Sequence, residues 1–299
     1  MNVATLLAAA AARLMQTVAL EYRDGCPEAR PEARLEARLL VAHGLGVNHA
    51  WLIAHDRDDL SDAQQRAVES LLVRRETGEP IAYILGEREF YGLAFNVSPA
   101  VLIPRADTEL LVETALQFIP KDSPFRALDL GAGSGAVAIT LALQRPLAEV
   151  WAVDISPAAL QVAAANAVKL GALNLNCVLG DWYQGLVVSQ NAVTPPKKFN
   201  LIVANPPYIA AADPHLVRGD LRFEPQQALV SGADGLNDLR RIIADAPAHL
   251  VPGGYLLLEH GYDQAVAVVE LLQQHGFSQV ATLQDLAGIN RVSLGCCFG

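Results

Sequence analysis

The stretch of this sequence most suited to chemistry is Asn205-Pro206-Pro207-Tyr208. It follows an apolar run rich in strand formers, residues 199–203, which predicts a buried strand. The two prolines donate no backbone N–H, and each forces the residue before it into an extended conformation. The carbonyls of Asn205 and Pro206 are therefore expected to point into a crevice, beside the Asn205 amide and the Tyr208 ring. These acceptors suit a planar group that carries an NH2, and a simple Asn-Pro turn is the alternative.

A glycine-rich turn follows an earlier strand pattern, in the segment Leu128-Asp129-Leu130-Gly131-Ala132-Gly133-Ser134-Gly135-Ala136. Glycines let the backbone approach a ligand without Cβ collisions, and the helix start presents unpaired N–H groups. Asp154, which lies 23 residues after Gly131, ends the next strand, where its carboxylate can accept both ribose hydroxyls of a nucleoside. The glycine spacing fits both a dinucleotide pattern and the pattern usual for S-adenosylmethionine. The loop alone therefore leaves both cofactors open.

A third segment, Gly180-Asp181-Trp182, follows the third expected strand of the same pattern. In a doubly wound sheet this end of the strand lies beside the ligand crevice. Asp181 can accept the amino group of an adenine there, and Trp182 can stack on the base or lie at its edge. A tryptophan packed into the protein interior is the alternative.

The elements that must position these segments alternate between strand and helix from Arg126 onward, which predicts a doubly wound α/β fold. The expected strands cover 127–130, 150–153, 175–179, 201–204, 255–258, 279–283 and 291–294. The expected helices cover about 134–143, 157–170, 238–249 and 262–275. The last two strands lack a convincing helix between them, so we expect them to be antiparallel to each other.

The residues before this pattern predict a different kind of structure. Positions from about 2 to 77 indicate helices only; Pro31 is expected to open one that Gly44 closes, and Ser61 to begin a capping box for another. A hairpin is expected to turn at Gly92. The resulting division is a helical domain at 1–78, a β-hairpin linker at 79–106 and the α/β domain at 107–299. Two loops, 181–198 and 209–237, are long enough to suggest function or mobility.

Composition limits the function classes. The net charge of −10 argues against broad electrostatic binding to nucleic acid, and no apolar run approaches transmembrane length. The apolar residues 3–12 read as the first helix of a soluble domain and not as a signal segment. The four cysteines show no metal-binding spacing, and reduced structural cysteines fit the cytoplasm. We expect no metal, no stable nucleic-acid partner and no membrane partner.

The segment Asn205-Pro206-Pro207-Tyr208, called the proline corner below, decides between a nicotinamide cofactor and S-adenosylmethionine. A nicotinamide enzyme needs a hydride-accepting carbonyl and usually an acid nearby, and no such constellation stands out in the sequence. The corner instead resembles the signature of methyltransferases that act on a planar nitrogen, which is adenine N6, cytosine N4 or a glutamine amide.

Nearly the whole chain then resembles one subgroup, the protein-glutamine N5-methyltransferases that modify peptide chain release factors. The matching segments outside the three described above are Pro80–Gly86, Arg88-Glu89-Phe90, Leu102-Ile103-Pro104-Arg105, Phe223-Glu224-Pro225, Ala228-Leu229, Gly253-Gly254, Glu259-His260-Gly261, and Asp285 with Gly288 and Arg291. The departures are mild, since Ala106 stands where proline is common, Tyr91 stands where tryptophan is frequent, and the loop at 187–198 looks longer than usual.

The resemblance implies S-adenosylmethionine as cofactor and the glutamine of a Gly-Gly-Gln loop as substrate, with the helical domain helping to hold the release factor. The expected catalytic residues are Asn205, Pro206 and Tyr208. The expected cofactor-binding residues are Gly131, Ala132, Gly133, Ser134, Gly135, Asp154, Asp181, Trp182 and Asn205. The expected substrate-binding residues are Asn205, Pro206, Pro207, Tyr208 and Arg105.

Some readings stay open beside this one. A glutamine methyltransferase of a ribosomal protein would share the same core, and a DNA adenine methyltransferase or a nicotinamide-dependent oxidoreductase are more distant rivals. Arg105 has a helix-start salt bridge as its alternative role. Glu259 and His260 end the fifth strand, away from the proline corner, and are expected to be structural.

Overall fold

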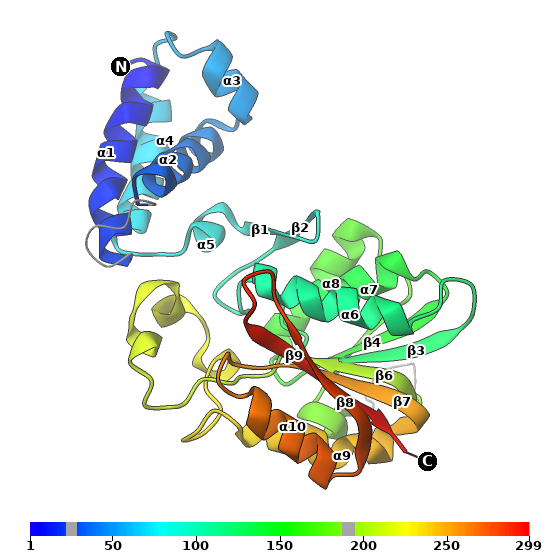
Figure 1. The fold of residues 1–299 in the computed structure, drawn as a ribbon. Helices are drawn as coiled ribbons and strands as arrows, with labels where there is room; N and C mark the ends of the chain where they lie inside the picture. Colours follow the sequence, from blue (N-terminus) through cyan, green and yellow to red (C-terminus); the bar gives the residue numbers. More distant parts are fainter. Residues whose placement is uncertain (22–28, 187–194, 299) are drawn as a thin grey trace. The chain divides into compact units, whose positions relative to one another are not determined.

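The computed structural model describes residues 1–21, 29–186 and 195–298 and divides into two compact units (Figure 1). One unit comprises Met1–Gly86 with Pro214–Phe223, and the other comprises Glu87–Asp213 with Glu224–Gly299. The segment 214–223 therefore interrupts the sequence of the second unit and packs with the helices of the first. The division into 1–78, 79–106 and 107–299 stays a prediction.

The first unit is helical, as expected, and contains α1 (Val3–Glu21), α2 (Ala29–Leu45), α3 (His49–Ala54), α4 (Asp62–Glu76) and α5 (Ile81–Leu85). Two short 3-10 helices, η3 (Pro214–Val217) and η4 (Gly219–Phe223), join it, and Arg222 Nη2 donates to the Thr77 carbonyl at 2.9 Å. The capping box at Ser61 is confirmed, with Gln64 as its partner. Burial of apolar side chains from α1, α2 and α4 stabilises the unit.

The expected bounds of α2 were wrong at both ends. The helix already includes Ala29, the first described residue after the gap at 22–28, so Pro31 does not open it, and it continues through Gly44 to Leu45. A Cβ at Gly44 would lie 2.8 Å from Val68 Cγ2, so the glycine permits the close approach of α2 to α4 and does not end the helix. The turn glycine is Gly46, which has a φ of +67°.

The second unit begins with the expected hairpin, formed by β1 (Glu87–Phe90) and β2 (Leu93–Asn96). Both turn residues have positive φ, 54° at Tyr91 and 74° at Gly92, which is the geometry of a tight two-residue hairpin. The short 3-10 turn η1 (Ala106–Thr108) then leads into α6 (Glu109–Phe118).

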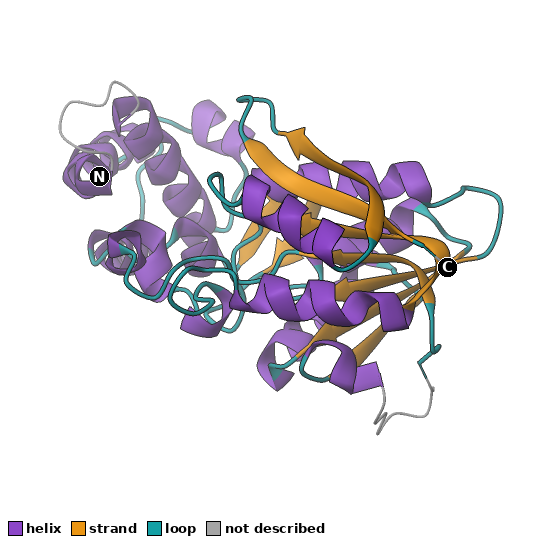
Figure 2. Ribbon diagram, turned by 60° about the horizontal axis from the view of Figure 1, so that its bottom comes forward, coloured by secondary structure: helices purple, strands orange, loops and turns teal. Residues whose placement is uncertain are grey.

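A seven-stranded sheet forms the centre of this unit (Figure 2). Its strands are β3 (Phe125–Leu130), β4 (Ala148–Asp154), β5 (Leu175–Leu179), β6 (Phe199–Ala204), β7 (Leu250–Glu259), β8 (Phe277–Gln284) and β9 (Asn290–Cys297), in the order β5-β4-β3-β6-β7-β9-β8. The first five are parallel to one another, and β9 is antiparallel to both of its neighbours. The doubly wound sheet with an antiparallel last strand is therefore confirmed.

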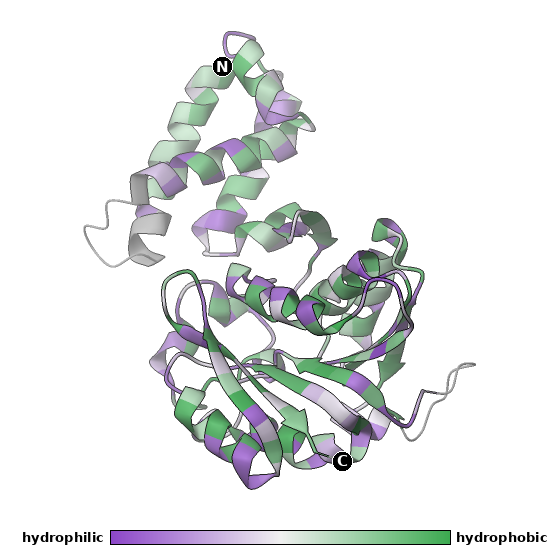
Figure 3. Cartoon of the chain, turned by 45° about the vertical axis from the view of Figure 1, so that its right-hand side comes forward, coloured by the Kyte–Doolittle hydropathy of each residue, from purple (hydrophilic) through white to green (hydrophobic). Residues whose placement is uncertain are grey.

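Helices cover both faces of the sheet and define two apolar cores. On one face lie α6, α7 (Ala136–Gln144) and α8 (Pro157–Leu170), and on the other lie α9 (Asn237–His249) and α10 (Ala265–Gln274). Alternate residues of β3 serve opposite cores, since Ala127 packs with the first and Leu128 with the second. The hydrophobic colours along the central strands in Figure 3 follow from burial on both sides.

Candidate active site

Strand register brings the separate sequence segments together at one edge of the sheet. Leu130, the last residue of β3, pairs with Val153 of β4 on one side and with Ala204 of β6 on the other. The chain order reverses at β3, and ligands of open α/β sheets bind at the carboxyl ends of the strands beside such a switch point. The glycine turn and Asn205 follow the ends of β3 and β6, and Asp154 is the last residue of β4, so the three lie side by side.

A cavity of about 250 Å³ opens at this edge. Its lining includes eight of the predicted site residues or their neighbours in the motifs: Gly131, Gly133, Asp154, Gly180, Asp181, Trp182, Asn205 and Pro207. The other lining residues are Ala100, Val101, Leu102, Val153, Ile155, Ser156, Ala159, Pro225, Gln227, Ala228, Asp238 and Arg241. A concave site with an apolar lining and a few convergent polar groups is typical of a small-molecule pocket.

The glycine turn is bonded directly to the acid that follows the next strand. The Gly133 N–H donates to Asp154 Oδ2 at 2.8 Å, and the Ser156 N–H donates to Asp154 Oδ1 at 2.8 Å. Burial raises the pKa of Asp154, and these backbone donors oppose that rise. Each carboxylate oxygen keeps a further lone pair, so a vicinal diol in the cavity could donate to both.

The other residues of the glycine turn lie behind the cavity wall. Ala132 and Ser134 are buried, and the Ser134 carbonyl accepts from Asn166 Nδ2 at 2.9 Å. Gly135 has a φ of +81°, and a Cβ there would lie 2.8 Å from Ile139 Cδ1 and 3.2 Å from Ala163 Cβ. The structure thus gives Gly135 a packing role between α7 and α8, while Gly131 and Gly133 face the cavity.

Trp182 lies over the glycine turn. A Cβ at Gly131 would be 3.2 Å from the Trp182 ring, and the indole Nε1 donates to Asp238 Oδ1 at 3.2 Å. Asp181 Oδ2 accepts from Arg241 Nη2 at 2.7 Å. The sequence reasoning missed Asp238 and Arg241, which come from the distant helix α9 and carry no local motif. Asp181, Trp182, Asp238 and Arg241 all line the cavity.

Asn205 is the most unusual polar group in the site. Its Nδ2 donates to Thr108 Oγ1 at 3.0 Å, whereas its Oδ1 is buried and accepts no hydrogen bond within the described part of the chain. A buried acceptor without a donor costs about 1–3 kcal/mol. Because Asn205 also lines the cavity, a ligand that brings an N–H to this oxygen would recover that cost.

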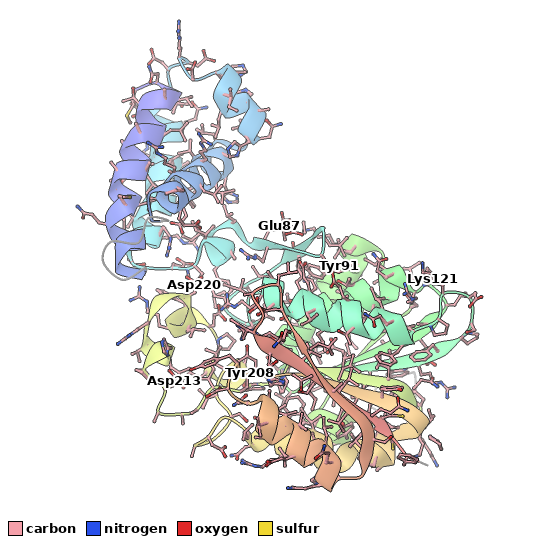
Figure 4. The ribbon with its side chains drawn as sticks, in the orientation of Figure 1. Glu87, Tyr91, Lys121, Tyr208, Asp213 and Asp220 are labelled. Atoms are coloured by element: carbon pink, nitrogen blue, oxygen red, sulfur yellow. The ribbon has the colours of Figure 1, made fainter. Side chains whose placement is uncertain are left out.

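The rest of the proline corner lies beside or behind Asn205. Pro207 lines the cavity, and Pro206 is buried. Tyr208, labelled in Figure 4, is outside the lining; its hydroxyl donates to Glu259 Oε1 at 3.5 Å and its carbonyl accepts from Gln264 Nε2 at 2.9 Å. A Cβ at Gly235 would come within 2.3 Å of that carbonyl oxygen, so only glycine allows this approach of the following loop.

The expected placement of Glu259 away from the proline corner was wrong. Leu258 of β7 pairs with Ala204 of β6, so Glu259, the last residue of β7, lies beside Asn205, the residue after β6, and its carboxyl reaches Tyr208. The order of the strands could have revealed this, because β6 and β7 are adjacent in the sheet. His260 is fully buried between the Ser293 hydroxyl and the Gly261 carbonyl, both at 2.9 Å from its ring nitrogens, which fits a structural residue.

Arg105 is also placed outside the cavity lining. Its Nη2 forms an ion pair with Glu224 Oε1 at 2.6 Å, and the Glu224 side chain is fully buried. The pair joins the segment before α6 to the segment that supplies Pro225, Gln227 and Ala228 to the cavity wall. Arg105 therefore supports that wall, and a direct contact with substrate stays a prediction.

We expect Glu259 to make stability depend on pH. Burial raises its pKa from 4.5 to about 7, with Asp107 adding to the rise and Thr108, Arg291 and Tyr208 opposing it. Between these values the folded chain holds a proton that the unfolded chain has released, so stability falls as pH rises from about 5 to about 8. The contribution is about 3 kcal/mol, at roughly 1.4 kcal/mol for each pKa unit.

Urea unfolding of the wild type and of Glu259→Gln across this pH range measures the effect. The stability advantage of the wild type over the variant should shrink steadily as the pH rises. Glu149→Gln, on the half-exposed end of β4, is the control and should show no such trend. A pH-independent difference for Glu259→Gln would show that the carboxyl titrates normally.

Comparison with known proteins extends these observations. A family model described as a PrmC N-terminal domain matches residues 26–86, and one described as a methyltransferase domain matches residues 121–286. Two solved structures share the fold: a methyltransferase from Pyrococcus furiosus (TM-score 0.50, 16% identity, 80% of this chain and 100% of that chain) and the catalytic domain of hMettl16 in complex with an RNA hairpin (TM-score 0.53, 17% identity, 77% and 82%).

The fold and the site thus define a methyltransferase. Proteins that are related in sequence define a narrower class. A release factor glutamine methyltransferase from Bordetella pertussis is 52% identical over 86% of this chain and 93% of its own length, and one from Salmonella typhimurium is 46% identical over 86% and 90%. The chain belongs to the release factor glutamine methyltransferase family.

Proposed function

We propose that this enzyme transfers the methyl group of S-adenosylmethionine to the side-chain amide nitrogen, N5, of the glutamine in the Gly-Gly-Gln motif of peptide chain release factors. The observation that carries the proposal is the buried Asn205 Oδ1, an acceptor without a donor in the described chain, on the wall of the cavity. A primary amide supplies the N–H that this oxygen lacks. The family relationship supports the release factor as substrate.

The cofactor would occupy the part of the cavity between β3, β4 and β5. Asp154 would accept the ribose hydroxyls, and Gly131 and Gly133 would let the backbone approach the methionine end. Trp182 would lie along the adenine, and Asp181 would accept from its amino group through the lone pairs that Arg241 leaves open. The cofactor supplies an activated methyl group when it is bound, so the protein has to bind and orient both partners.

The chemistry at the amide nitrogen is chiefly a matter of position. The lone pair of an amide nitrogen is spread into the carbonyl, which makes it a poor nucleophile. In our proposal Asn205 Oδ1 and the Pro206 carbonyl accept the two amide hydrogens, which holds the nitrogen in line with the methyl group and raises its electron density. Tyr208 would pack beside the amide plane. Alignment of the reacting groups can supply about 7–11 kcal/mol of the barrier, and the proton that is lost can pass to water.

The same acceptors would select glutamine over glutamate. A glutamate carboxylate brings two oxygens and no hydrogens, so it would face Asn205 Oδ1 with like partial charges. An unpaired buried polar group costs about 1–3 kcal/mol, and more when it is charged. Other primary amides would satisfy the corner as well, so we propose that contacts outside the cavity, including those of the helical unit, choose the release factor.

The test is mass spectrometry of the Gly-Gly-Gln peptide after incubation of a release factor with the enzyme and S-adenosylmethionine. We expect a mass increase of one methyl group on the glutamine, and none when that glutamine is replaced by glutamate. Tritiated cofactor with release factor, ribosomal protein and DNA in parallel separates the rivals, because label in either of the last two alone would overturn the proposal.

The site of action belongs to the same proposal. Release factors work in the cytoplasm, and Cys296 and Cys297 form no disulfide. None of the described helices is long and apolar enough to cross a membrane. We therefore propose a cytoplasmic enzyme whose partner is the release factor itself.

A further inference from the structure

Thr108 touches the catalytic corner although it comes from a distant part of the sequence. It ends η1 and lies directly before α6. Its side chain makes no capping hydrogen bond there. The hydroxyl instead lies 3.0 Å from Asn205 Nδ2 and is 5% exposed, so its partners come from the protein interior.

Which group donates in the hydrogen bond between Asn205 and Thr108 follows from the nearby Glu259 carboxyl. A hydroxyl has one proton to donate, and its oxygen can also accept. The neighbouring Thr108 side chain lowers the pKa of the fully buried Glu259 carboxyl, against the rise that burial causes. Above about pH 7 the Glu259 carboxyl is ionised and only accepts, so the Thr108 proton is directed to Glu259 while the Thr108 oxygen accepts from Asn205 Nδ2 at 3.0 Å.

Tyr208, at the other end of the proline corner, is also held by hydrogen bonds. Tyr208, three residues after Asn205, donates its hydroxyl to the same Glu259 carboxyl. Gln264 accepts from the Gly261 N–H at 2.9 Å and donates to the Tyr208 carbonyl at 2.9 Å. Both ends of the proline corner therefore depend on a fixed set of buried partners, with the Glu259 carboxylate between them.

We infer that Thr108 is a positioning residue, which holds the Asn205 amide with its NH2 toward Thr108 and its oxygen toward the substrate amide. The inference rests on the proposed function, because it concerns how the same corner binds its substrate. Rotation of the Asn205 amide by half a turn would present an NH2 group to the NH2 of the substrate. A correctly oriented Asn205 is thus needed for turnover and for the preference for glutamine over glutamate.

Replacement of Thr108 by valine keeps the shape and removes the hydroxyl. With a release factor as substrate at about pH 8, where Glu259 is ionised, we expect Thr108→Val to lower kcat by about 10-fold to 100-fold. The cofactor affinity, measured by calorimetry, should stay within about twofold, because Thr108 is outside the cavity lining. Thr108→Ser keeps the hydroxyl and should retain most of the activity.

Thr114→Val is the matched control. Thr114 lies in α6, is 2% exposed and donates to the Leu110 carbonyl at 2.7 Å, so valine removes a comparable hydroxyl away from the corner. A second measurement is independent of how much enzyme is folded: the KM for the glutamine form of the release factor divided by the inhibition constant of the form with glutamate in its motif. We expect this ratio to rise at least 10-fold in Thr108→Val and to be unchanged in Thr114→Val.

The outcomes distinguish the proposed function of the enzyme from the positioning role of Thr108. A wild-type enzyme that leaves the glutamine unmodified overturns the proposed function itself. A wild-type enzyme that methylates it, together with a Thr108→Val variant of unchanged kcat and unchanged ratio, overturns the role of Thr108 alone. Equal losses in the serine and valine variants would overturn it too, since they would trace the effect to the packing of the methyl group.

Discussion

Replacement of Asn205 by alanine is expected to lower kcat about a thousandfold and to leave cofactor affinity within a few-fold of the wild type. The variant loses Oδ1, the acceptor that aligns the substrate amide, and it loses the Asn205–Thr108 hydrogen bond. Removal of one group that stabilises a transition state typically costs a factor of 10²–10³. A thousandfold loss corresponds to about 4 kcal/mol, at 1.36 kcal/mol for each factor of ten.

Asn205→Ala should lower the activity without lowering the stability. Oδ1 is buried without a donor, so its removal relieves a cost of about 1–3 kcal/mol while the loss of the Thr108 contact adds about 0.5–1.5 kcal/mol. We therefore expect a Tm equal to or above that of the wild type. Single-turnover methyl transfer, calorimetry with the cofactor and thermal unfolding measure the three quantities separately.

The matched control is Asn200→Ala on the same strand. Asn200 Oδ1 accepts from the Arg126 N–H at 3.0 Å near the other end of β6, so this variant loses a side-chain amide that has a partner. It should be less stable than the wild type and fully active. Turnover of Asn205→Ala within a factor of a few would contradict the acceptor role, and a parallel loss of cofactor binding would place Asn205 with the cofactor instead.

The sheet could be predicted from the sequence because its physical signals are local. Each central strand is a short apolar run, since it is buried on both faces, and each helix after it repeats apolar residues on one side. The glycine turn and the proline corner stand at strand ends, where backbone groups are free to face a ligand. Register then brings them together without any further information, as the pairing of Leu130 with Ala204 shows.

The contacts that lack a local signal were the ones sequence reasoning missed. Thr108 carries no local signal that links it to Asn205, and only the folded chain brings its hydroxyl to that residue, 97 positions away. Gly44 looks like a helix end, and its packing against Val68 depends on how two helices meet. Part of the loop at 181–198, expected to be functional or mobile, lies outside the described residues, and the loop at 209–237 contains the short 3-10 helices η3, η4 and η5 (Gln226–Ala228).

Replacement of Asp154 by alanine should weaken cofactor binding about 100-fold while leaving kcat at saturating cofactor within a few-fold. In our proposal each carboxylate oxygen accepts one ribose hydroxyl, and a hydrogen bond to a charged group is worth about 1.5–3 kcal/mol. The variant also leaves the Gly133 N–H without its 2.8 Å partner, so the glycine turn loses a support that fixes its shape. Both effects act on the cofactor and neither acts on the substrate amide, which separates Asp154 from Asn205.

Calorimetry with S-adenosylmethionine and with its demethylated product should give the same loss for both, because the ribose is common to them. Glu149→Ala, at the other end of β4, removes a carboxylate that pairs with Arg126 on the surface and should bind both ligands normally. Asp154→Asn discriminates further, since it keeps one acceptor and should fall between alanine and the wild type. Unchanged affinity in Asp154→Ala would remove this carboxylate from the cofactor site, whereas a loss for the methylated form alone would tie it to the sulfonium charge and not to the ribose.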